Sequence, residues 1–357
     1  MRKLVIDRAA IKNNLTVIKD RAAGAAIYGV VTGDGQGVGA AALAQLLRDE
    51  GIGRFAVSEI AEAEALRQAG FVDEEILMLR ATTDREELER LVDLNVVCTV
   101  SSVDTGMALN ALAGNRSTVA EAHIQVDTGM GFGGFLVSEP EKLLLAYRSM
   151  PNVALSGVYT QLHAVRPNDP QAKRQLEQFQ QALDAIHDAG FETGVVHAAG
   201  SFALLHGLTP ELDGVRAGSA VLGRCRRTRD DGLKTVGFGQ APLTEVRWLP
   251  KGHVLGVDRP VTLKKPTRVA VLPVGYQNGF GVTRPRETGL LAAIARWRKN
   301  NRRTVRLGSQ RARVLGGLGA SELILDVTDL KCKYIPIWKR KRPIKTKWRV
   351  PSSRSVV

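Results

Sequence analysis

An apolar run that breaks into a glycine-rich turn is the first place where this sequence could do chemistry. Residues 27–31 read Ile-Tyr-Gly-Val-Val, and residues 32–39 read Thr-Gly-Asp-Gly-Gln-Gly-Val-Gly. The apolar run predicts a buried strand, and the glycines after it allow the backbone to approach a ligand closely. The turn that begins at Thr32 is therefore a candidate ligand-binding loop.

Three further residues have the types that bind a phosphate. Ser201 offers a hydroxyl, and Gly218 and Ser219 offer backbone N–H groups after a predicted strand. Such a nest can hold a phosphate dianion without a lysine. The alternative is that Ser201 caps a helix and that Gly218 only makes a turn.

Titratable side chains at or near other predicted strand ends extend the candidate site. They are Asp127, His163, His197, Arg216 and Tyr276. The guanidinium of Arg216 stays charged at any relevant pH. Each also has a structural interpretation: Arg216 could pair with a carboxylate, His163 could be a satisfied core histidine, and Tyr276 could pack at a turn. Asp127 could simply organise its loop.

Separate segments along residues 1 to about 330 resemble the alanine racemase family. The strand and turn at residues 27–39 resemble the motif in which this family's lysine holds pyridoxal phosphate as a Schiff base. The other segments are Phe55-Ala56-Val57-Ser58, Glu62-Ala63, Leu66-Arg67, Val126-Asp127-Thr128-Gly129-Met130, Leu162-His163-Ala164, His197-Ala198-Ala199-Gly200-Ser201, Val215-Arg216-Ala217-Gly218, Val274-Gly275-Tyr276-Gln277-Asn278-Gly279-Phe280 and Asp326-Val327-Thr328-Asp329. One segment would be a weak signal, but the whole set in order implies the family's fold, its cofactor, a small amino-acid substrate such as alanine, and a homodimer.

The resemblance assigns cofactor-binding roles. Ser201, Gly218 and Ser219 would hold the cofactor phosphate. Arg216 would donate to the pyridine nitrogen and so keep it unprotonated, which weakens the ring as an electron sink and suits racemisation. His197 would lie near the ring.

The resemblance also assigns catalytic roles. Racemisation needs a proton donor and a proton acceptor on opposite faces of the substrate Cα. Tyr276, reaching in from the partner subunit, would serve one face, and His163 would hydrogen-bond this tyrosine and lower its pKa. Arg216 would complete the surroundings. The lysine serves the other face in the family, and Thr32 stands at its position.

The sequence departs from the family's pattern at five positions of the site. Thr32 has no amine and cannot form the covalent link. Gln36 stands where a cofactor-binding tyrosine helps to hold the phosphate. Gln125 replaces a lysine that is often carbamylated, Phe132 replaces an arginine, and Ala320 replaces a methionine.

The alternation of short apolar strands with amphipathic helices predicts how these residues are positioned. The predicted strands of the first part are Ile27–Val31, Phe55–Val57, Ile76–Leu79, Val96–Val100, Ala122–Val126, Leu155–Tyr159, Gly194–His197 and either Val215–Arg216 or Val221–Leu222. The predicted helices are Ala40–Asp49, Ile60–Ala69, Arg85–Leu91, Glu139–Arg148 and Pro170–Ala189. Eight strands without a nucleotide fingerprint favour a (β/α)₈ TIM-type barrel, over residues 1–230, with its chemistry at the carboxyl ends of the strands.

A mainly β domain, over residues 231–330, is predicted to follow the barrel and to supply Tyr276. Its predicted strands are Leu243–Leu249, Val261–Leu263, Arg268–Pro273, Ala312–Leu315 and Leu323–Val327, with a helix near Gly289–Lys299. Residues 331–357 form a basic tail without a clear period, which we expect to be poorly ordered.

Charge and composition narrow the class of protein. The formal net charge is +14, yet residues 331–357 carry ten Lys or Arg and no acid, so the basicity is local. No apolar run is long enough for a membrane span, and residues 1–7 lack the apolar region that a signal peptide would have. Three distant cysteines give no disulfide framework and no metal spacing, which favours a cytoplasmic protein.

Three hypotheses follow. The first is a pyridoxal-phosphate-dependent amino-acid racemase that interconverts L-alanine and D-alanine, with activity impaired by Thr32. The second is a catalytically inactive homologue that binds cofactor or amino acid, or acts as a partner subunit. The third, less favoured, is association with nucleic acid through the basic tail.

Overall fold

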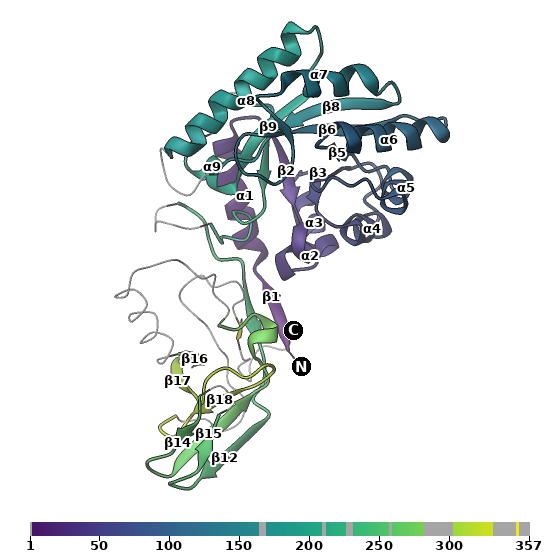
Figure 1. The fold of residues 1–357 in the computed structure, drawn as a ribbon. Coiled ribbons are helices and arrows are strands. Elements are labelled where there is room, and N and C mark those ends of the chain that lie inside the picture. The colour runs from purple at the N-terminus through teal and green to yellow at the C-terminus, as the bar shows by residue number, and fades with distance from the viewer. Residues whose placement is uncertain are drawn as a thin grey trace. The chain divides into compact units, whose positions relative to one another are not determined.

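The computed structural model describes residues 2–163, 169–208, 212–225, 231–256, 259–281, 303–330 and 348–349 (Figure 1). The chain divides into two compact units, one from Arg8 to Lys234 and the other joining the residues up to Asp7 with those from Thr235 onward. The predicted domains 1–230, 231–330 and 331–357 stay predictions. The division shows that the first strand of the chain pairs outside the unit that follows it.

Eight parallel strands form the first unit, as predicted. Their bounds are β2 Ala26–Val30, β3 Arg54–Val57, β4 Glu75–Met78, β5 Cys98–Val100, β6 Ala120–Asp127, β8 Val153–Tyr159, β9 Val195–Gly200 and β10 Gly214–Ala217. Their order is β4-β3-β2-β10-β9-β8-β6-β5. The open edges of β4 and β5 meet at a parallel bridge between Leu77 and Val97, where the Met78 N–H donates to the Val97 carbonyl at 2.9 Å. The sheet therefore closes into the predicted barrel.

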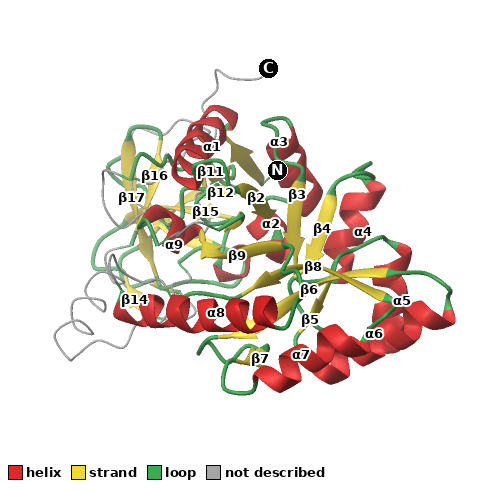
Figure 2. Ribbon diagram, turned by 90° about the horizontal axis from the view of Figure 1, so that it is seen from above, coloured by secondary structure: helices red, strands yellow, loops and turns green. Residues whose placement is uncertain are grey.

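Helices surround these strands (Figure 2). Their bounds are α1 Arg8–Ala22, α3 Ala40–Arg48, α4 Ile60–Gln68, α5 Arg85–Asp93, α6 Val103–Asn115, α7 Pro140–Ser149, α8 Pro170–Asp188 and α9 Ser201–Leu205. A short strand, β7 Phe135–Leu136, pairs with β6. Two helix starts follow local capping chemistry, because Asp84 accepts the Glu87 N–H before α5 and Ser102 accepts the Thr105 N–H before α6. Proline begins α7 and α8, where its missing N–H costs nothing.

The second unit is mainly β, as predicted. An antiparallel sheet has the order β12-β15-β18-β17-β16, with bounds β12 Glu245–Leu249, β15 Thr267–Leu272, β16 Thr304–Leu307, β17 Gln310–Leu315 and β18 Leu323–Asp326. A two-stranded hairpin joins β13 Val254–Leu255 and β14 Val261–Thr262, and a 3₁₀ turn, η1, spans Tyr276–Asn278. Fully buried Ala270, Val305 and Leu325 lie in its core. The predicted helix near Gly289–Lys299 lies outside the described residues.

Both ends of the chain contribute to a third small sheet of this unit. The first strand, β1 Lys3–Ile6, pairs antiparallel with β11 Gly237–Gln240, and β19 Trp348–Arg349 pairs with β11 in parallel. These pairings were not predicted, because the hydrophobic pattern of a four-residue strand is too short to indicate which strand it pairs with. Of the predicted basic tail, only Trp348 and Arg349 lie within the described residues.

Candidate functional site

The turn after β2 has an unusual handedness. Residues Gly33, Asp34, Gly35 and Gln36 have φ of 67°, 51°, 59° and 55°, so the segment labelled α2, Thr32–Gly37, is a left-handed turn that starts at Thr32. This conformation costs roughly 1–2 kcal/mol for a residue with a Cβ, whereas its cost for glycine is small. Gly33 and Gly35 thus adopt the left-handed conformation at little cost, whereas Asp34 and Gln36 need contacts that stabilise it.

The buried carboxylate of Glu62 supplies the main contact. Its Oε1 accepts the Asp34 N–H at 2.9 Å, and its Oε2 accepts the Ser58 and Glu59 N–H groups at 2.9 and 3.2 Å. The Asp34 carboxylate in turn accepts the Ala40 N–H at 2.9 Å, at the start of α3. One carboxylate therefore fixes both the turn after β2 and the start of α4.

The predicted phosphate-binding residues meet between β9 and β10. Ser201 Oγ accepts the N–H of Gly218 at 3.0 Å and the N–H of Ala220 at 3.2 Å. Gly200, not Ser201, is the N-cap of α9, so the interpretation of Ser201 as a helix cap is wrong. The Ser219 hydroxyl lies 2.6 Å from Cys225 Sγ. The hydroxyl of Ser201 and the loop after β10 thus form one cluster at the carboxyl ends of two adjacent strands.

Gly218 brings this cluster against the turn after β2. A Cβ at position 218 would lie 2.8 Å from Gln36 Nε2 and 3.0 Å from Val30 Cβ, both closer than side chains tolerate. Gly218 is therefore required for close approach rather than for a left-handed turn. Gln36, Gly218 and Ser201 therefore lie together, and their shared role in binding a ligand stays a prediction.

Arg216 and His197 are joined inside the barrel. Arg216 Nη1 lies 2.5 Å from His197 Nδ1, and Nη2 donates to the Thr160 carbonyl at 2.6 Å and to Gln161 Oε1 at 3.0 Å. Burial lowers the pKa of Arg216 to about 10, so the group stays charged at neutral pH. Among the described residues no carboxylate pairs with Arg216, so the interpretation of a strand-end salt bridge is wrong.

A second histidine, His123, extends this chain of contacts. Its Nδ1 lies 3.0 Å from His197 Nε2. Because a guanidinium can only donate, His197 Nδ1 must accept from Arg216, and its proton must sit on Nε2 and donate to His123. Burial, aided by the charge of Arg216, lowers the pKa of His123 to about 4 and the pKa of His197 well below its usual value.

Two tyrosines fix the plane of His197. The ring centroids of Tyr28 and Tyr159 each lie 5.0 Å from that of His197 in stacked geometry. The Tyr159 hydroxyl lies 2.9 Å from Thr99 Oγ1, and the guanidinium of Arg216 lies 5.1 Å from the Tyr159 ring centroid. His123, Tyr28 and Tyr159 were not predicted as site residues, although polar side chains within apolar strands are a signal that could have indicated them.

Two other predicted residues of the barrel, His163 and Asp127, contact neighbours outside the group around Arg216 and His197. His163 is half-exposed, and its Nδ1 lies 3.8 Å from Asp169 Oδ2. The interpretation of His163 as a core histidine is therefore wrong. Asp127 Oδ1 accepts the N–H groups of Gly129 and Met130 at 2.8 and 2.9 Å, which is the loop-organising role predicted for it. Phe132 is 76% exposed.

Tyr276 belongs to the second unit. Its side chain is 50% exposed, and its backbone N–H donates to the Gly319 carbonyl at 3.1 Å, next to Ala320. The half-exposed side chain of Tyr276 fits a turn tyrosine at the edge of its unit, and its catalytic role stays a prediction.

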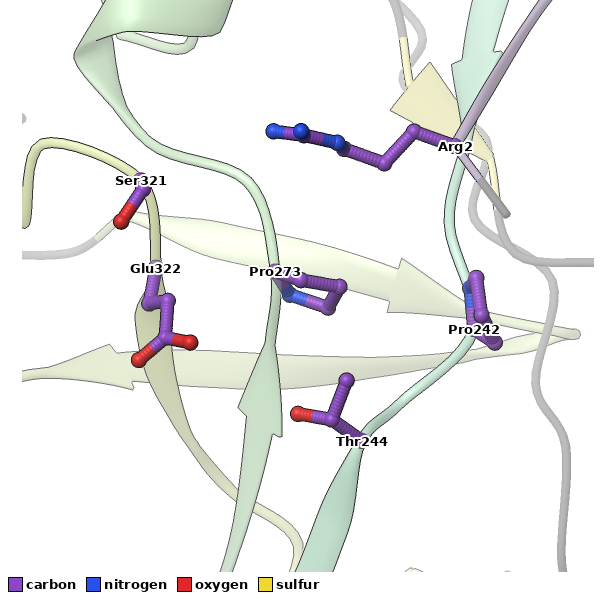
Figure 3. A pocket seen from close by; sticks show the side chains of 6 residues that line it. All are labelled: Arg2, Pro242, Thr244, Pro273, Ser321 and Glu322. Carbon is purple, nitrogen blue, oxygen red and sulfur yellow. The ribbon is translucent and has the colours of Figure 1, made fainter.

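A shallow recess of about 360 Å³ lies in the same unit (Figure 3). Its lining residues are Arg2, Pro242, Thr244, Pro273, Ser321 and Glu322. In Figure 3 the Arg2 side chain extends across the recess toward Ser321. None of the residues predicted from the sequence lines it.

The described part of the chain lacks both a metal-ligand cluster and a membrane-spanning helix. It contains no group of three or more His, Cys, Asp or Glu side chains placed to hold a metal ion. None of its helices is both long enough and apolar enough to cross a membrane.

Comparisons with known proteins point to one family. The family model "Alanine racemase, N-terminal domain" matches residues 6–225, and "Alanine racemase, C-terminal domain" matches residues 239–342. The alanine racemase of Clostridium tetani is 29% identical over 283 residues, which is 77% of this chain and 72% of that protein. The alanine racemase of Geobacter sp. strain M21 is 26% identical over 336 residues, which is 91% of this chain and 84% of that protein.

Solved structures show the same fold. The alanine racemase of Clostridium difficile 630 superposes with a TM-score of 0.80 at 22% identity and covers 93% of this chain and 84% of that chain. The alanine racemase of Bartonella henselae, solved with covalently bound pyridoxal phosphate, has a TM-score of 0.78 at 22% identity and covers 99% of this chain and 90% of that chain.

Proposed function

This chain belongs to the alanine racemase family, and from this premise we propose that it binds pyridoxal phosphate in its barrel without a covalent link and acts on small amino acids as an impaired racemase. The observation that carries the proposal is the cluster in which Ser201 Oγ, the loop at Gly218 and the side chain of Gln36 meet at strand ends.

The residues of the cluster suit a phosphate monoester attached to an aromatic ring. Gly218 has no room for a Cβ because Gln36 and Val30 pack directly against it, so the Gln36 amide lies beside the loop after β10 and can donate to an anion bound there. Ser201 Oγ accepts two N–H groups, and its hydroxyl proton, which now faces the Cys225 thiol, can rotate to donate to an anion. Arg216 is a buried cation without a carboxylate among the described residues, and a neutral ring nitrogen is an acceptor that such a group favours.

Thr32 is the residue that does not suit covalent attachment. It lies two residues after the end of the strand β2 and opens the left-handed turn, at the position where the resemblance puts the family's lysine. A hydroxyl has no amine for the aldehyde, so retention of the cofactor must rest on non-covalent contacts. Loss of one positioned base also slows proton transfer by roughly 10²–10⁴-fold.

Each residue then has a defined task. The bound cofactor supplies an electron-withdrawing ring that makes the Cα proton of an amino acid easier to remove. Ser201 and the loop at Gly218 would orient the phosphate, and Arg216 would donate a hydrogen bond to the ring nitrogen, which would stay unprotonated. Tyr276 is the proposed proton carrier for one face of Cα, reached across a homodimer interface, and the opposite face has no base from Thr32.

An absorbance spectrum tests the proposal. Purified protein mixed with pyridoxal phosphate should shift the spectrum of the cofactor, and gel filtration should remove the shift. Borohydride followed by mass spectrometry of the intact chain should detect no covalent adduct. A stable adduct would contradict non-covalent binding, and an unchanged spectrum with no measurable affinity would contradict the cofactor assignment.

A second candidate is a non-catalytic member of the family that binds cofactor or amino acid, or pairs with an active subunit. The absence of an amine at Thr32, together with an exposed Tyr276, favours it. D-alanine formation from L-alanine with added cofactor separates the two: a slow rate that depends on Tyr276 supports the first, and a rate equal to that of cofactor alone supports the second.

A further inference from the structure

Arg224 is a partly buried cation for which the described part of the barrel unit supplies no carboxylate. Its Nη1 donates to the Gln36 carbonyl at 2.9 Å and lies 3.4 Å from Gln36 Oε1, and its backbone N–H donates to the Ser219 carbonyl at 2.7 Å. Burial lowers its pKa. Among the described residues no carboxylate lies within ion-pair distance of it, whereas exposed arginines of this unit, such as Arg80 and Arg85, pair with glutamates.

The position of Arg224 relates it to the cluster at Gly218. The amide of Gln36 lies between them, because its Oε1 faces Arg224 and its Nε2 lies 2.8 Å from where a Gly218 Cβ would be. Ser201 Oγ bonds to the N–H of the same glycine. A partly buried, unpaired charge is costly unless an anion compensates it.

We propose that Arg224, acting with the amide of Gln36, is the counter-charge for a phosphate dianion bound at the loop after β10. The inference rests on the proposed function, since it takes the dianion to be the phosphate of the cofactor. It goes further by naming the residue that sets the affinity. In a chain whose residue 32 has no amine, this charge replaces part of the retention that a covalent link would provide.

The chemistry favours an arginine in this role. A guanidinium keeps its charge when partly desolvated, and its fork can donate to Gln36 and to a phosphate oxygen at the same time. Hydrogen bonds to charged groups contribute more than neutral ones, so removal of the charge should weaken binding by about tenfold to a hundredfold. Part of this contribution should disappear at high salt.

The experiment compares dissociation constants for three probes: pyridoxal phosphate, pyridoxal without its phosphate, and inorganic phosphate. The protein variants are Arg224→Gln, which keeps a donor without the charge, and Arg224→Lys, which keeps the charge. The control is Arg247→Gln, which removes the same charge from an exposed residue of the other unit. Thermal unfolding of each variant shows that it is folded.

We expect Arg224→Gln to weaken both phosphate-bearing probes and to leave pyridoxal unchanged, with Arg224→Lys in between and Arg247→Gln like the unaltered chain. If the unaltered chain binds pyridoxal phosphate and Arg224→Gln binds it equally well, the role of Arg224 is refuted while the proposed function stands. If only inorganic phosphate binds, and does so through Arg224, the anion site stands and the proposed function fails. If no phosphate-bearing probe binds, both are refuted.

Discussion

His197 Nε2 lies 3.0 Å from His123 Nδ1, and this contact sets the proton positions along a buried chain that ends at Arg216. With one proton placed on His197 Nε2, its Nδ1 is left as an acceptor for the guanidinium. A protonated His197 would instead point an N–H at a cation, which the barrel interior disfavours. His123 is thus a positioning residue that keeps Arg216 aligned through a neutral imidazole.

The buried histidines predict how stability depends on pH. The pKa of His123 falls to about 4 in the folded chain from an ordinary value near 6.5, so the unfolded chain binds more protons between these values. The free energy of unfolding should therefore fall as the pH drops from about 6.5 toward 4, by on the order of 1 kcal/mol per pH unit for one such histidine.

His123→Gln tests this dependence, because glutamine does not titrate. Urea unfolding across this pH range should show a shallower slope for His123→Gln than for the unaltered chain, and His187→Gln, in α8, is the control. Equal slopes would mean that His123 titrates normally in the folded chain. Nitrogen-15 NMR of the histidine rings should show His197 protonated on Nε2 alone at neutral pH.

Glu62 is predicted to carry much of the stability of the turn after β2. In Glu62→Gln one oxygen becomes an NH₂ group that faces backbone N–H donors, so at least one of them loses its acceptor. The free energy of unfolding should fall by about 1–3 kcal/mol. Glu64→Gln, on the same helix and paired with exposed Arg90, should change it by about 0.5 kcal/mol or less. If the free energy of unfolding fell equally in both variants, Glu62 would not stabilise the turn more than an exposed glutamate of the same helix does.

The sequence was sufficient to predict the barrel because its strands are apolar runs at regular spacing. All eight strands lie within a few residues of their predicted positions, and the last is Gly214–Ala217, the first of the two alternatives. The pairing of β1 with β11 was not predictable, since backbone hydrogen bonds between distant short strands leave no mark in composition.

The site was predictable where a residue type has few structural uses, and less so where contacts decide. Ser201 and Gly218 were predicted because a hydroxyl and a glycine after strands indicate anion binding, and Gln36 was predicted from the resemblance. The structure brings the three together, and their roles as ligands stay predictions. His123 and Arg224 were missed, because their importance arises from neighbours supplied by other strands. The roles of Tyr276 and His163 stay predictions that rest on the resemblance.

Gly218→Ala should test whether position 218 requires glycine because its backbone packs closely against Gln36 and Val30. The added Cβ would displace Gln36 Nε2 and press on Val30, at a cost of about 1–3 kcal/mol in stability, and should weaken the binding of pyridoxal phosphate. Gly53→Ala is the matched control, because no atom lies within 4 Å of the Cβ it would add. If Gly218→Ala binds the cofactor as tightly as Gly53→Ala, the loop after β10 does not approach the phosphate.

Thr32→Lys combined with Gln36→Tyr should restore covalent attachment. The lysine would begin the left-handed turn two residues after β2, at the position of the family's lysine, and the tyrosine would return a hydroxyl to the phosphate end. Borohydride should then fix one cofactor to the chain, with the adduct on the peptide that contains residue 32, and D-alanine should form from L-alanine at least about a hundredfold faster than in the unaltered chain. Gln36→Tyr alone should do neither. Attachment without racemisation in the double variant would indicate that the pocket is intact but that Tyr276 does not reach the substrate, and absence of attachment would show that residue 32 does not face the aldehyde.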